Sequence, residues 1–455
     1  MRTKLSSPYW VPVWFFAAAI LSGALLLHFS ISHPGGPLTW LDALFTATSA
    51  ICVTGLIVVD TGSHLGPLGQ GVVLVLMQLG GLGIMTFTSL LAHLLGRRVT
   101  LGDRIAVGQS LLHDPAFSLG GFLARVVCGV LALEAVGAVC LHLLDPDGFP
   151  AFSAVFHAVS AFCNAGFSLQ ADSLSAWRGD VAVNLVFMAL IVLGGLGFHV
   201  LNELAGLARR VLRGRGLRRR GAPGLLTWHT RVVLATSAFL ILGGAAGIFL
   251  AERLSGGWDL PLSEQVLVSF FQSVTCRTAG FNTVDVAGLS NVSLLLMIVL
   301  MGIGGSPGSC AGGVKTTTFR AWIGFVGAQI RGRSQARIQG TALTRASMNK
   351  ALTLSVFAFL FVLVGLVLLT VLEGGAVPHT QARGQFMETL FETMSAFGTV
   401  GLSTGMTDTL SGAGKVVVIV LMFVGRLGPM WLLAALQSWQ REPAFRLPED
   451  DLPMG

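Results

Sequence analysis

The chain has 455 residues, of which 53% are hydrophobic and only 11% are charged, and its mean hydropathy is +0.75. This composition excludes a water-soluble globular fold and predicts an integral membrane protein. The formal net charge of +7 does not indicate a nucleic-acid partner. The arginines stand in short clusters between apolar stretches, where they act as topology signals.

Eight apolar stretches, most of about 20 residues or more, predict membrane-spanning helices. In chain order they are about 9–30, 71–95, 117–144, 181–205, 230–250, 292–325, 351–372 and 415–436. The first resembles a signal peptide, but no cleavage site is obvious and further spans follow, so we interpret it as a transmembrane helix. Arginine clusters follow the second, fourth and sixth spans. By the positive-inside rule we expect them, and both termini, on the cytoplasmic side of the cell membrane.

One short motif occurs four times between these spans. The copies are Leu41–Asp60, Phe152–Ala171, Val266–Asp285 and Met387–Met406. Aligned on their shared glycines, they have a phenylalanine ten residues upstream of the glycine: Phe45, Phe156, Phe270 and Phe391. The segment before each glycine has about three helical turns, too few to cross a membrane. It therefore predicts a half-helix that dips into the membrane and is followed by an irregular loop.

The predicted fold is all-α, with four fused repeats around one pore in a pseudo-fourfold arrangement. Each repeat contains a span, a pore half-helix, a filter loop and a second span. We place the repeats at residues 1–112, 113–225, 226–340 and 341–455, the last with a short cytoplasmic tail. Irregular backbone at membrane depth must be buried in protein or line water, as a pore allows. The negative ends of four half-helices would favour a cation there.

Side chains differ among the four filters while the glycine is constant, which predicts coordination by backbone carbonyls. Glycine permits positive φ, so that successive carbonyls can point toward one axis, as in potassium-channel filters. The predicted K⁺-binding residues are Val53, Thr54, Gly55, Asn164, Ala165, Gly166, Thr278, Ala279, Gly280, Thr399, Val400 and Gly401. In the alternative interpretation each glycine only makes a turn at the end of a span.

A second glycine motif, G-x-x-G, lies within each second span. Its copies begin at Gly80, Gly194, Gly302 and Gly425. No strand precedes these glycines, so a nucleotide site is excluded, and we expect close helix packing or a kink.

The sixth span contains a stretch that cannot form a continuous helix, because it is rich in glycine and contains a proline. We predict a gate loop at about residues 302–315, below the filter. Its candidate gating residues are Gly304, Gly305, Ser306, Pro307, Gly308, Ser309, Cys310, Ala311, Gly312, Gly313 and Lys315. The alternatives are a linker outside the membrane and, for Lys315, a side chain that snorkels to the interface.

Arg426 is a further candidate gating residue, because it lies inside an otherwise apolar span. A charge within the membrane is costly and usually faces a cavity or a partner. We therefore assign it to the pore side, where it would bind backbone carbonyls of the loop or repel cations. A purely structural buried arginine is the alternative.

These motifs together resemble the Trk/Ktr/HKT superfamily of potassium transporters, and within it the Ktr-type membrane subunits. The resemblance rests on the filters VTGL, NAGFS, TAGFNT and TVGLSTG, the loop GGSPGSCAGGVKTTT, and GRLGP around Arg426. It covers nearly the whole chain. A glycine in the first filter, Gly55, resembles potassium-selective members, whereas sodium-preferring members often carry serine. Cys310 stands where the family has threonine or serine.

The resemblance implies K⁺ uptake, with Na⁺ as a candidate activator, by a homodimer in the cell inner membrane that contacts lipid. It also implies a separate cytoplasmic ring of nucleotide-binding RCK domains, since we expect no cofactor in this chain. Two other functions are alternatives to K⁺ uptake. A small-solute secondary transporter would need paired inverted halves, whereas the basic clusters recur on one side. An intramembrane enzyme would need convergent catalytic groups, which are not evident.

Overall fold

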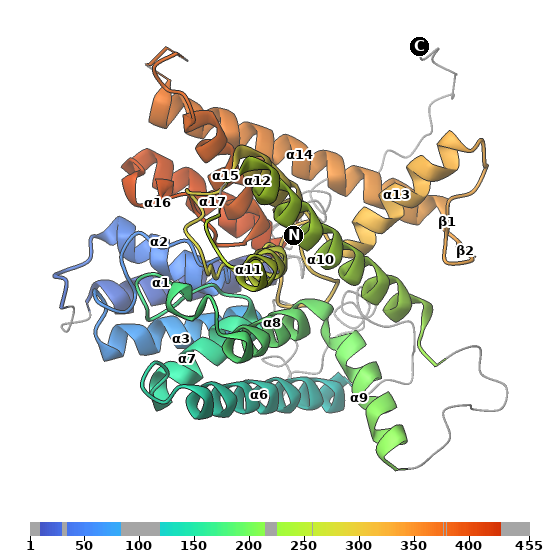
Figure 1. The fold of residues 1–455 in the computed structure, drawn as a ribbon, viewed down its shortest axis with the longest axis horizontal. Helices are drawn as coiled ribbons and strands as arrows, with labels where there is room; N and C mark the ends of the chain where they lie inside the picture. Colours follow the sequence, from blue (N-terminus) through green and yellow to red (C-terminus); the bar gives the residue numbers. More distant parts are fainter. Residues whose placement is uncertain are drawn as a thin grey trace, which may run out of the picture.

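The protein is described by a computed structural model that defines residues 10–29, 34–82, 119–213, 225–256, 258–375, 377–378 and 380–428. Within these ranges it is mostly helical, with very little strand (Figure 1). The α-helices are α1 (Val11–His28), α2 (Trp40–Ile51), α3 (Pro67–Gly81), α6 (Leu119–Leu144), α7 (Ala151–Cys163), α8 (Val181–Leu196), α9 (Phe198–Leu212), α10 (Trp228–Ser255), α11 (Leu262–Thr275), α12 (Asn291–Gly302), α13 (Thr316–Ile330), α14 (Arg345–Gly374), α15 (Gln385–Gly398), α16 (Met406–Thr409) and α17 (Gly412–Leu427).

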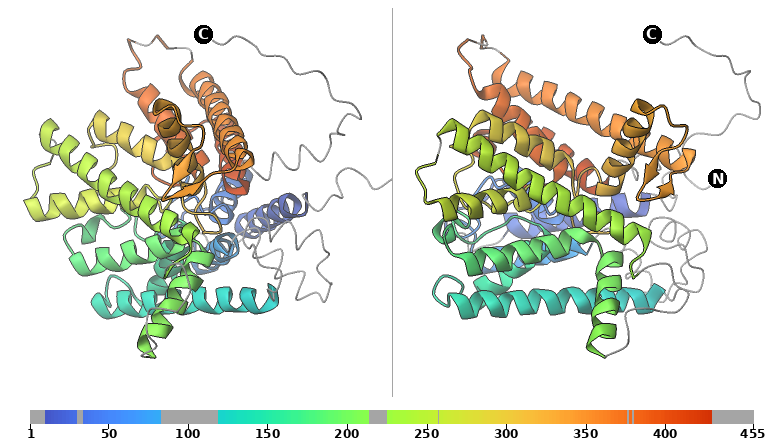
Figure 2. Two further views of the ribbon diagram at one scale, coloured as in Figure 1. Left: turned by 90° about the vertical axis from the view of Figure 1, so that its right-hand side faces the viewer. Right: turned by 45° about the vertical axis from the view of Figure 1, so that its right-hand side comes forward.

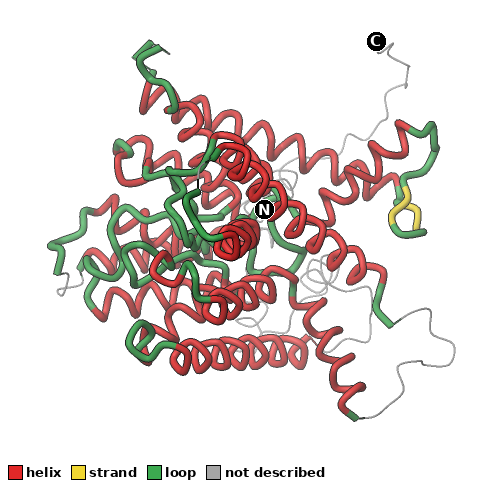
Figure 3. The backbone as a smooth tube through the Cα atoms, viewed as in Figure 1, coloured by secondary structure: helices red, strands yellow, loops and turns green. Residues whose placement is uncertain are grey.

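Two short strands, β1 (Arg337–Ile338) and β2 (Thr341–Ala342), pair antiparallel in the hairpin between α13 and α14. The turn residues Gln339 and Gly340 both have positive φ, as a two-residue hairpin turn requires. A 3-10 turn, Ser175–Trp177, follows the second filter. The hairpin lies at the opposite end of the molecule from the loops that surround α2 and α16 (Figure 3).

The helices confirm the predicted fourfold repetition. Each repeat has a first helix, a shorter pore helix and a second helix: α1–α2–α3, α6–α7–α8, α10–α11–α12 and α14–α15–α17. The pore helices have 12 to 14 residues, fewer than a crossing needs. Hydroxyl side chains begin several helices by accepting a backbone N–H, as Thr39 does for α2 and Ser411 for α17.

The repeats pack head to tail and close into a ring. The second helix of each repeat contacts the pore helix of the next: α3 on α7, α8 on α11, α12 on α15, and α17 back on α2. The first helices of repeats two and four, α6 and α14, accordingly lie on opposite sides of the molecule (Figure 2). The filters that follow the pore helices are thereby brought together at the centre.

Three helices of the described part are long and apolar enough to cross a membrane: Ala124–Leu144, Trp228–Ser255 and Arg345–Gly374. Only 22% of the most apolar window of α14 is buried within the protein. Many of its other apolar side chains, among them Phe359, Leu363 and Val367, are exposed, as they would be toward lipid. Several shorter apolar helices accompany these three, so the chain is a multi-pass membrane protein.

In repeats two, three and four the second helix ends within the G-x-x-G motif, at Leu196, Gly302 and Leu427. The continuous span expected at 181–205 was wrong: α8 and α9 meet at an angle of 111°. Gly197, between them, has φ +89°, which ends the helix. The predicted break after α12 is confirmed, and α17 ends before Gly428 at φ +78°. The predicted continuations at 83–95 and 429–436 lie outside the described residues.

Candidate ion pathway

The four motif glycines form a closed ring, here called the glycine ring. Each has positive φ: +91° at Gly55, +72° at Gly166, +80° at Gly280 and +91° at Gly401. A Cβ on Gly55 would lie 2.9 Å from the Cα of Gly166, one on Gly166 3.0 Å from Gly280, one on Gly280 3.4 Å from Gly401, and one on Gly401 3.0 Å from Gly55. Residues separated by more than 100 positions therefore enclose one axis.

The carbonyl of the residue before each glycine lies against the ring glycine of a neighbouring repeat. A Cβ on Gly55 would meet Ala165 O at 2.6 Å, and one on Gly280 would meet Val400 O at 2.6 Å. The other two contacts are made by Thr54 O and Ala279 O. Carbonyls from all four repeats thus crowd the same narrow space, an arrangement that can replace the hydration shell of a monovalent cation.

The filter backbone is held in a conformation that its side chains do not favour. The residues two positions before the glycines also have positive φ, and three of them are β-branched: Val53 (55°), Asn164 (59°), Thr278 (71°) and Thr399 (51°). Such conformations persist only where surrounding contacts enforce them, and they concentrate at functional sites. This conformation could not be predicted from the residue types, because valine and threonine normally avoid positive φ.

The pore helices supply the enforcing contacts. The amides of Thr54, Ala165, Ala279 and Val400 donate to the carbonyls of Ser49, Ser160, Thr275 and Ser395 at 2.7 to 2.9 Å. The hydroxyls of these four residues also hold the filters. Ser49 Oγ and Ser395 Oγ accept the N–H of the ring glycine at 3.1 Å. In repeats two and three the hydroxyl instead donates to the carbonyl after the glycine, at 2.8 and 2.6 Å.

Sequence reasoning missed these four hydroxyls, although a signal was present. Ser49, Ser160 and Ser395 each precede their glycine by six residues. Thr275 precedes Gly280 by five, so the third pore helix is offset by one residue. The same offset appears in the core, where Phe271 is fully buried and Phe270 is only partly buried. The residue equivalent to Phe45, Phe156 and Phe391 is therefore Phe271 and not Phe270, which the spacing to the glycine had predicted.

The first glycines of three G-x-x-G motifs permit close packing of a second helix on a pore helix. A Cβ on Gly80, Gly194 or Gly425 would collide with the carbonyl of Ile51, Phe162 or Phe397, each four residues before a ring glycine. The motif therefore acts as both a packing site and a helix end. Repeat three is the exception, because Gly302 has only Met394 nearby, with its Sδ at 3.6 Å.

The predicted gate loop is hydrogen-bonded to the bend between α8 and α9. Ser306 N donates to Gly195 O at 3.0 Å and Cys310 N to Gly194 O at 3.1 Å, while Phe198 N donates to Gly308 O at 2.9 Å. The loop is closed on itself by Gly304 N, which donates to Val314 O at 2.9 Å. These contacts join the loop to the second repeat.

The loop also reaches the fourth filter. A Cβ on Gly312 would meet Thr399 Cβ at 3.0 Å, and one on Gly313 would lie 3.5 Å from Gly398 O. Lys315 does not snorkel outward: its Nζ donates to Ala311 O at 2.6 Å, within the loop.

Two buried arginines donate hydrogen bonds to carbonyls of the loop. Arg426 is 8% exposed, and its guanidinium donates to Cys310 O in the loop and to Gly80 O at the end of α3. This is the carbonyl-binding role considered for it from the sequence. Arg277, whose orientation the sequence left open, donates to Ile303 O at 3.4 Å, where the loop begins. The contacts of Arg426 thus join the third repeat to the first.

Comparison with known proteins agrees with this geometry. The cation transport protein (TrkH) family model matches residues 15–440. The Ktr system potassium uptake protein B of Bacillus subtilis is 36% identical over 94% of this chain and 92% of its own length. The potassium/sodium uptake protein NtpJ of Enterococcus hirae is 33% identical over 100% and 98%. The crystal structure of the potassium transporter TrkH from Vibrio parahaemolyticus matches with a TM-score of 0.72 at 19% identity, over 97% of this chain and 86% of that one. The chain therefore belongs to the TrkH family of cation transport proteins.

Proposed function

We propose that this chain is the ion-translocating membrane subunit of a K⁺ uptake system of the Ktr type. The observation that carries this proposal is the glycine ring, in which four filters converge and the carbonyl before each glycine lies against the glycine of a neighbouring filter. The names of the B. subtilis and E. hirae relatives, which match over nearly their full length, support K⁺ as the ion. The E. hirae name also includes sodium, which supports Na⁺ as a candidate activator or second ion.

The carbonyls of the filter residues are the proposed K⁺ ligands. They belong to Val53, Thr54, Gly55, Asn164, Ala165, Gly166, Thr278, Ala279, Gly280, Thr399, Val400 and Gly401. Because the backbone supplies the ligands, the differences in side chains among repeats are tolerated. No cofactor is required for this chemistry, and K⁺ is the transported ion.

The gate loop is the proposed barrier to the ion below the filter. Its contacts with Thr399 of the fourth filter and with Arg426 support this role. Deletion of residues 306–312 is expected to raise basal K⁺ flux. An unchanged basal flux, with the variant present at wild-type amounts in the membrane, would show that the barrier lies elsewhere.

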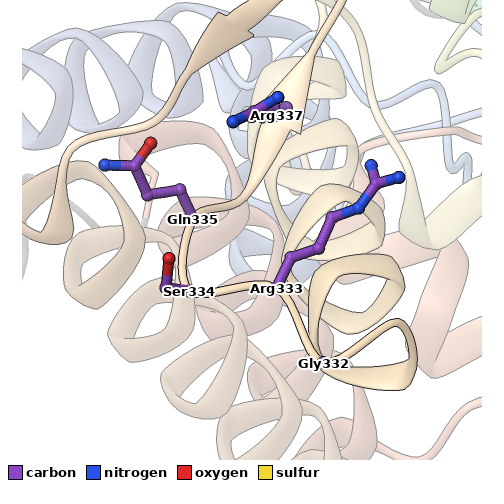
Figure 4. Close-up of a pocket in the computed structure, with 5 residues that line it drawn as sticks. All are labelled: Gly332, Arg333, Ser334, Gln335 and Arg337. Carbon is purple, nitrogen blue, oxygen red and sulfur yellow. The ribbon is translucent and has the colours of Figure 1, made fainter.

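We also propose a cytoplasmic docking surface for a separate RCK-domain ring. The segment between α13 and β1 forms a pocket of about 340 Å³ lined by Gly332, Arg333, Ser334, Gln335 and Arg337 (Figure 4). Its two exposed arginines suit an acidic partner surface, although a topology signal alone would have the same composition. The proposal also includes a homodimer in the lipid membrane, with both termini on the cytoplasmic side. The four repeats of each subunit are proposed at residues 1–112, 113–225, 226–340 and 341–455.

Uptake in cells that lack their own K⁺ systems tests the function. Expression of the chain is expected to restore K⁺ uptake at low external K⁺. The Gly55→Ser variant is expected to discriminate less between K⁺ and Na⁺, because a side chain there would lie 2.6 Å from Ala165 O. Unchanged discrimination in this variant would contradict the filter assignment, and absence of uptake by the wild-type chain would contradict the function.

A further inference from the structure

One position on the pore helices carries a buried polar side chain in every repeat. With the offset of the third pore helix taken into account, it is occupied by Thr46, His157, Gln272 and Glu392. All four residues are at most 2% exposed. The position lies behind the filter, one residue after the fully buried phenylalanine of each pore helix. A buried polar group is costly unless it is paired, so its partners indicate what it does.

In repeat four the side chain binds the outer end of the filter. Glu392 Oε2 accepts the hydroxyl of Ser403 at 2.8 Å, and its Oε1 accepts the hydroxyl of Thr407. Ser403 follows ring residue Gly401 by two positions. Its Oγ also accepts the N–H of Gly405 at 3.1 Å, so one serine fixes the turn that leaves the filter. The carboxylate therefore anchors the segment just outside the glycine ring.

In repeat two a different side chain makes the equivalent contact. His157 Nδ1 lies 2.8 Å from Ser153 O, which can only accept, so Nδ1 carries the proton. Nε2 is then an acceptor. It accepts the N–H of Leu169 at 3.3 Å and the hydroxyl of Ser168 at 3.1 Å. Ser168 follows ring residue Gly166 by two positions, as Ser403 follows Gly401.

Repeats one and three lack this connection. Thr46 Oγ1 and both amide atoms of Gln272 have no hydrogen-bond partner within the described residues. The residues two positions after their glycines are Ile57 and Asn282, neither of which contacts them by a hydrogen bond. Because the repeats follow one another around the ring, repeats two and four face each other across the axis. The two anchored filters are therefore opposite, and the two unanchored filters lie between them.

We propose that Glu392 and His157 are positioning residues that set the discrimination between K⁺ and Na⁺. The proposal rests on the K⁺ uptake function stated above. Carbonyl filters discriminate through the geometry of their oxygen ring and the strength of its dipoles, and both require the ring to hold its width. Two buried acceptors, one on each side, fix the exits of opposite filters and so resist narrowing of the ring around the smaller ion. Neither residue contacts the ion.

The test removes the hydroxyl partners, which are small and partly exposed, so that folding is little affected. Ser403→Ala and Ser168→Ala are each expressed in cells without their own K⁺ systems, and Rb⁺ uptake is measured. The ratio measured is the Na⁺ concentration that halves this uptake divided by the K⁺ concentration that halves it. This ratio reports discrimination between the two ions and does not depend on the amount of protein. Each variant is expected to lower this ratio by about fivefold, which is the size of effect expected from the loss of one buried hydrogen bond. Thr46→Val, at the equivalent unanchored position, is expected to leave it within about twofold.

A double-variant cycle separates positioning from general disturbance. Glu392→Leu, which leaves no acceptor for the Ser403 hydroxyl, is expected to lower the ratio. Adding Ser403→Ala is expected to lower it no further, since both changes act through one contact. The proposal is overturned if both serine variants keep the wild-type ratio, if Thr46→Val lowers it equally, or if the two changes in repeat four are additive. Loss of Rb⁺ uptake by the wild-type chain would instead overturn the function on which the proposal rests.

Discussion

Two separate constraints act on each ring glycine. Its φ is positive, a conformation that costs other residues about 1 to 2 kcal/mol, and the space for a Cβ is already filled by a neighbouring repeat. The first constraint was predictable from the repeated glycine alone. The second was not, because it depends on which filter lies beside which, and neither were the positive φ values of Val53 and Thr399.

The two constraints can be separated within the fourth filter. Gly401 and Gly405 have φ of +91° and +92°, but a Cβ on Gly401 would meet the Thr54 carbonyl, whereas one on Gly405 has nothing within 4 Å. Gly401→Ala is expected to abolish selective K⁺ uptake. Gly405→Ala should retain it, at a cost of about 1 to 2 kcal/mol in stability. Rb⁺ uptake and thermal unfolding of the two purified variants check this, and equal loss of selectivity would mean that φ alone sets the requirement.

Arg426 was identifiable from the sequence as an intramembrane charge, but its two partners were not. It donates to carbonyls from the gate loop and from α3, which a planar guanidinium can bridge and a single ammonium cannot. Arg426→Lys and Arg426→Ala are therefore both expected to release the loop and raise basal K⁺ flux in reconstituted vesicles. A lysine variant with wild-type flux would show that the charge, and not the bridge, is what matters.

Among the elements, the helix pair α8–α9 departs most from the sequence prediction. Its composition favours one long span, since the residues on both sides of Gly197 are mostly apolar. The break is explained by the gate loop, whose Gly308 carbonyl takes the N–H of Phe198 in place of a helical bond. A loop from repeat three thus determines where a helix in repeat two breaks. The helix propensities of the local residues do not predict this long-range effect.

This dependence predicts that a change at the bend will affect gating. A Cβ on Gly197 would lie 2.7 Å from Pro307 O in the gate loop, and its φ of +89° disfavours any other residue. Gly197→Ala is expected to displace the loop and raise basal K⁺ flux. Gly206→Ala, in α9 with nothing within 4 Å, should leave flux unchanged and stabilise the helix by about 0.5 to 1 kcal/mol. Comparable flux in the two variants would contradict coupling of the bend to the loop.

For the whole molecule, the repeated motif was sufficient to predict four equivalent parts but not how the last meets the first. The head-to-tail contacts, from α3 on α7 to α17 on α2, run in one direction around the ring. Parallel copies of this kind do not form the inverted halves expected of many secondary transporters. No linker joins the fourth repeat to the first. Closing the ring of repeats therefore requires contacts between them that the repeated motif does not contain.

One such contact is the ion pair between Asp42 of α2 and Lys415 of α17, at 2.6 Å, with side chains 18% and 16% exposed. Partial burial raises the pKa of the Asp42 carboxyl, but hydrogen bonds from Lys415 and Thr39 and the charge of Lys415 outweigh this and hold the pKa below its usual value. A carboxyl with a depressed folded-state pKa stabilises the fold above its unfolded-state pKa of about 3.9, and this contribution is lost as the pH falls through the folded-state value.

Asp42→Asn is therefore expected to lower stability at pH 7 by about 1 kcal/mol, the upper range for a partly exposed pair. The difference from the wild-type chain should shrink as the pH falls below about 4 and vanish once Asp42 is protonated in the folded state. Thermal unfolding in detergent across this pH range measures it. The comparison variant is Arg178→Ala, since the Arg178–Glu264 pair between repeats two and three is 42% and 28% exposed and should contribute little. A pH-independent deficit in Asp42→Asn would indicate that packing, and not the ion pair, closes the ring.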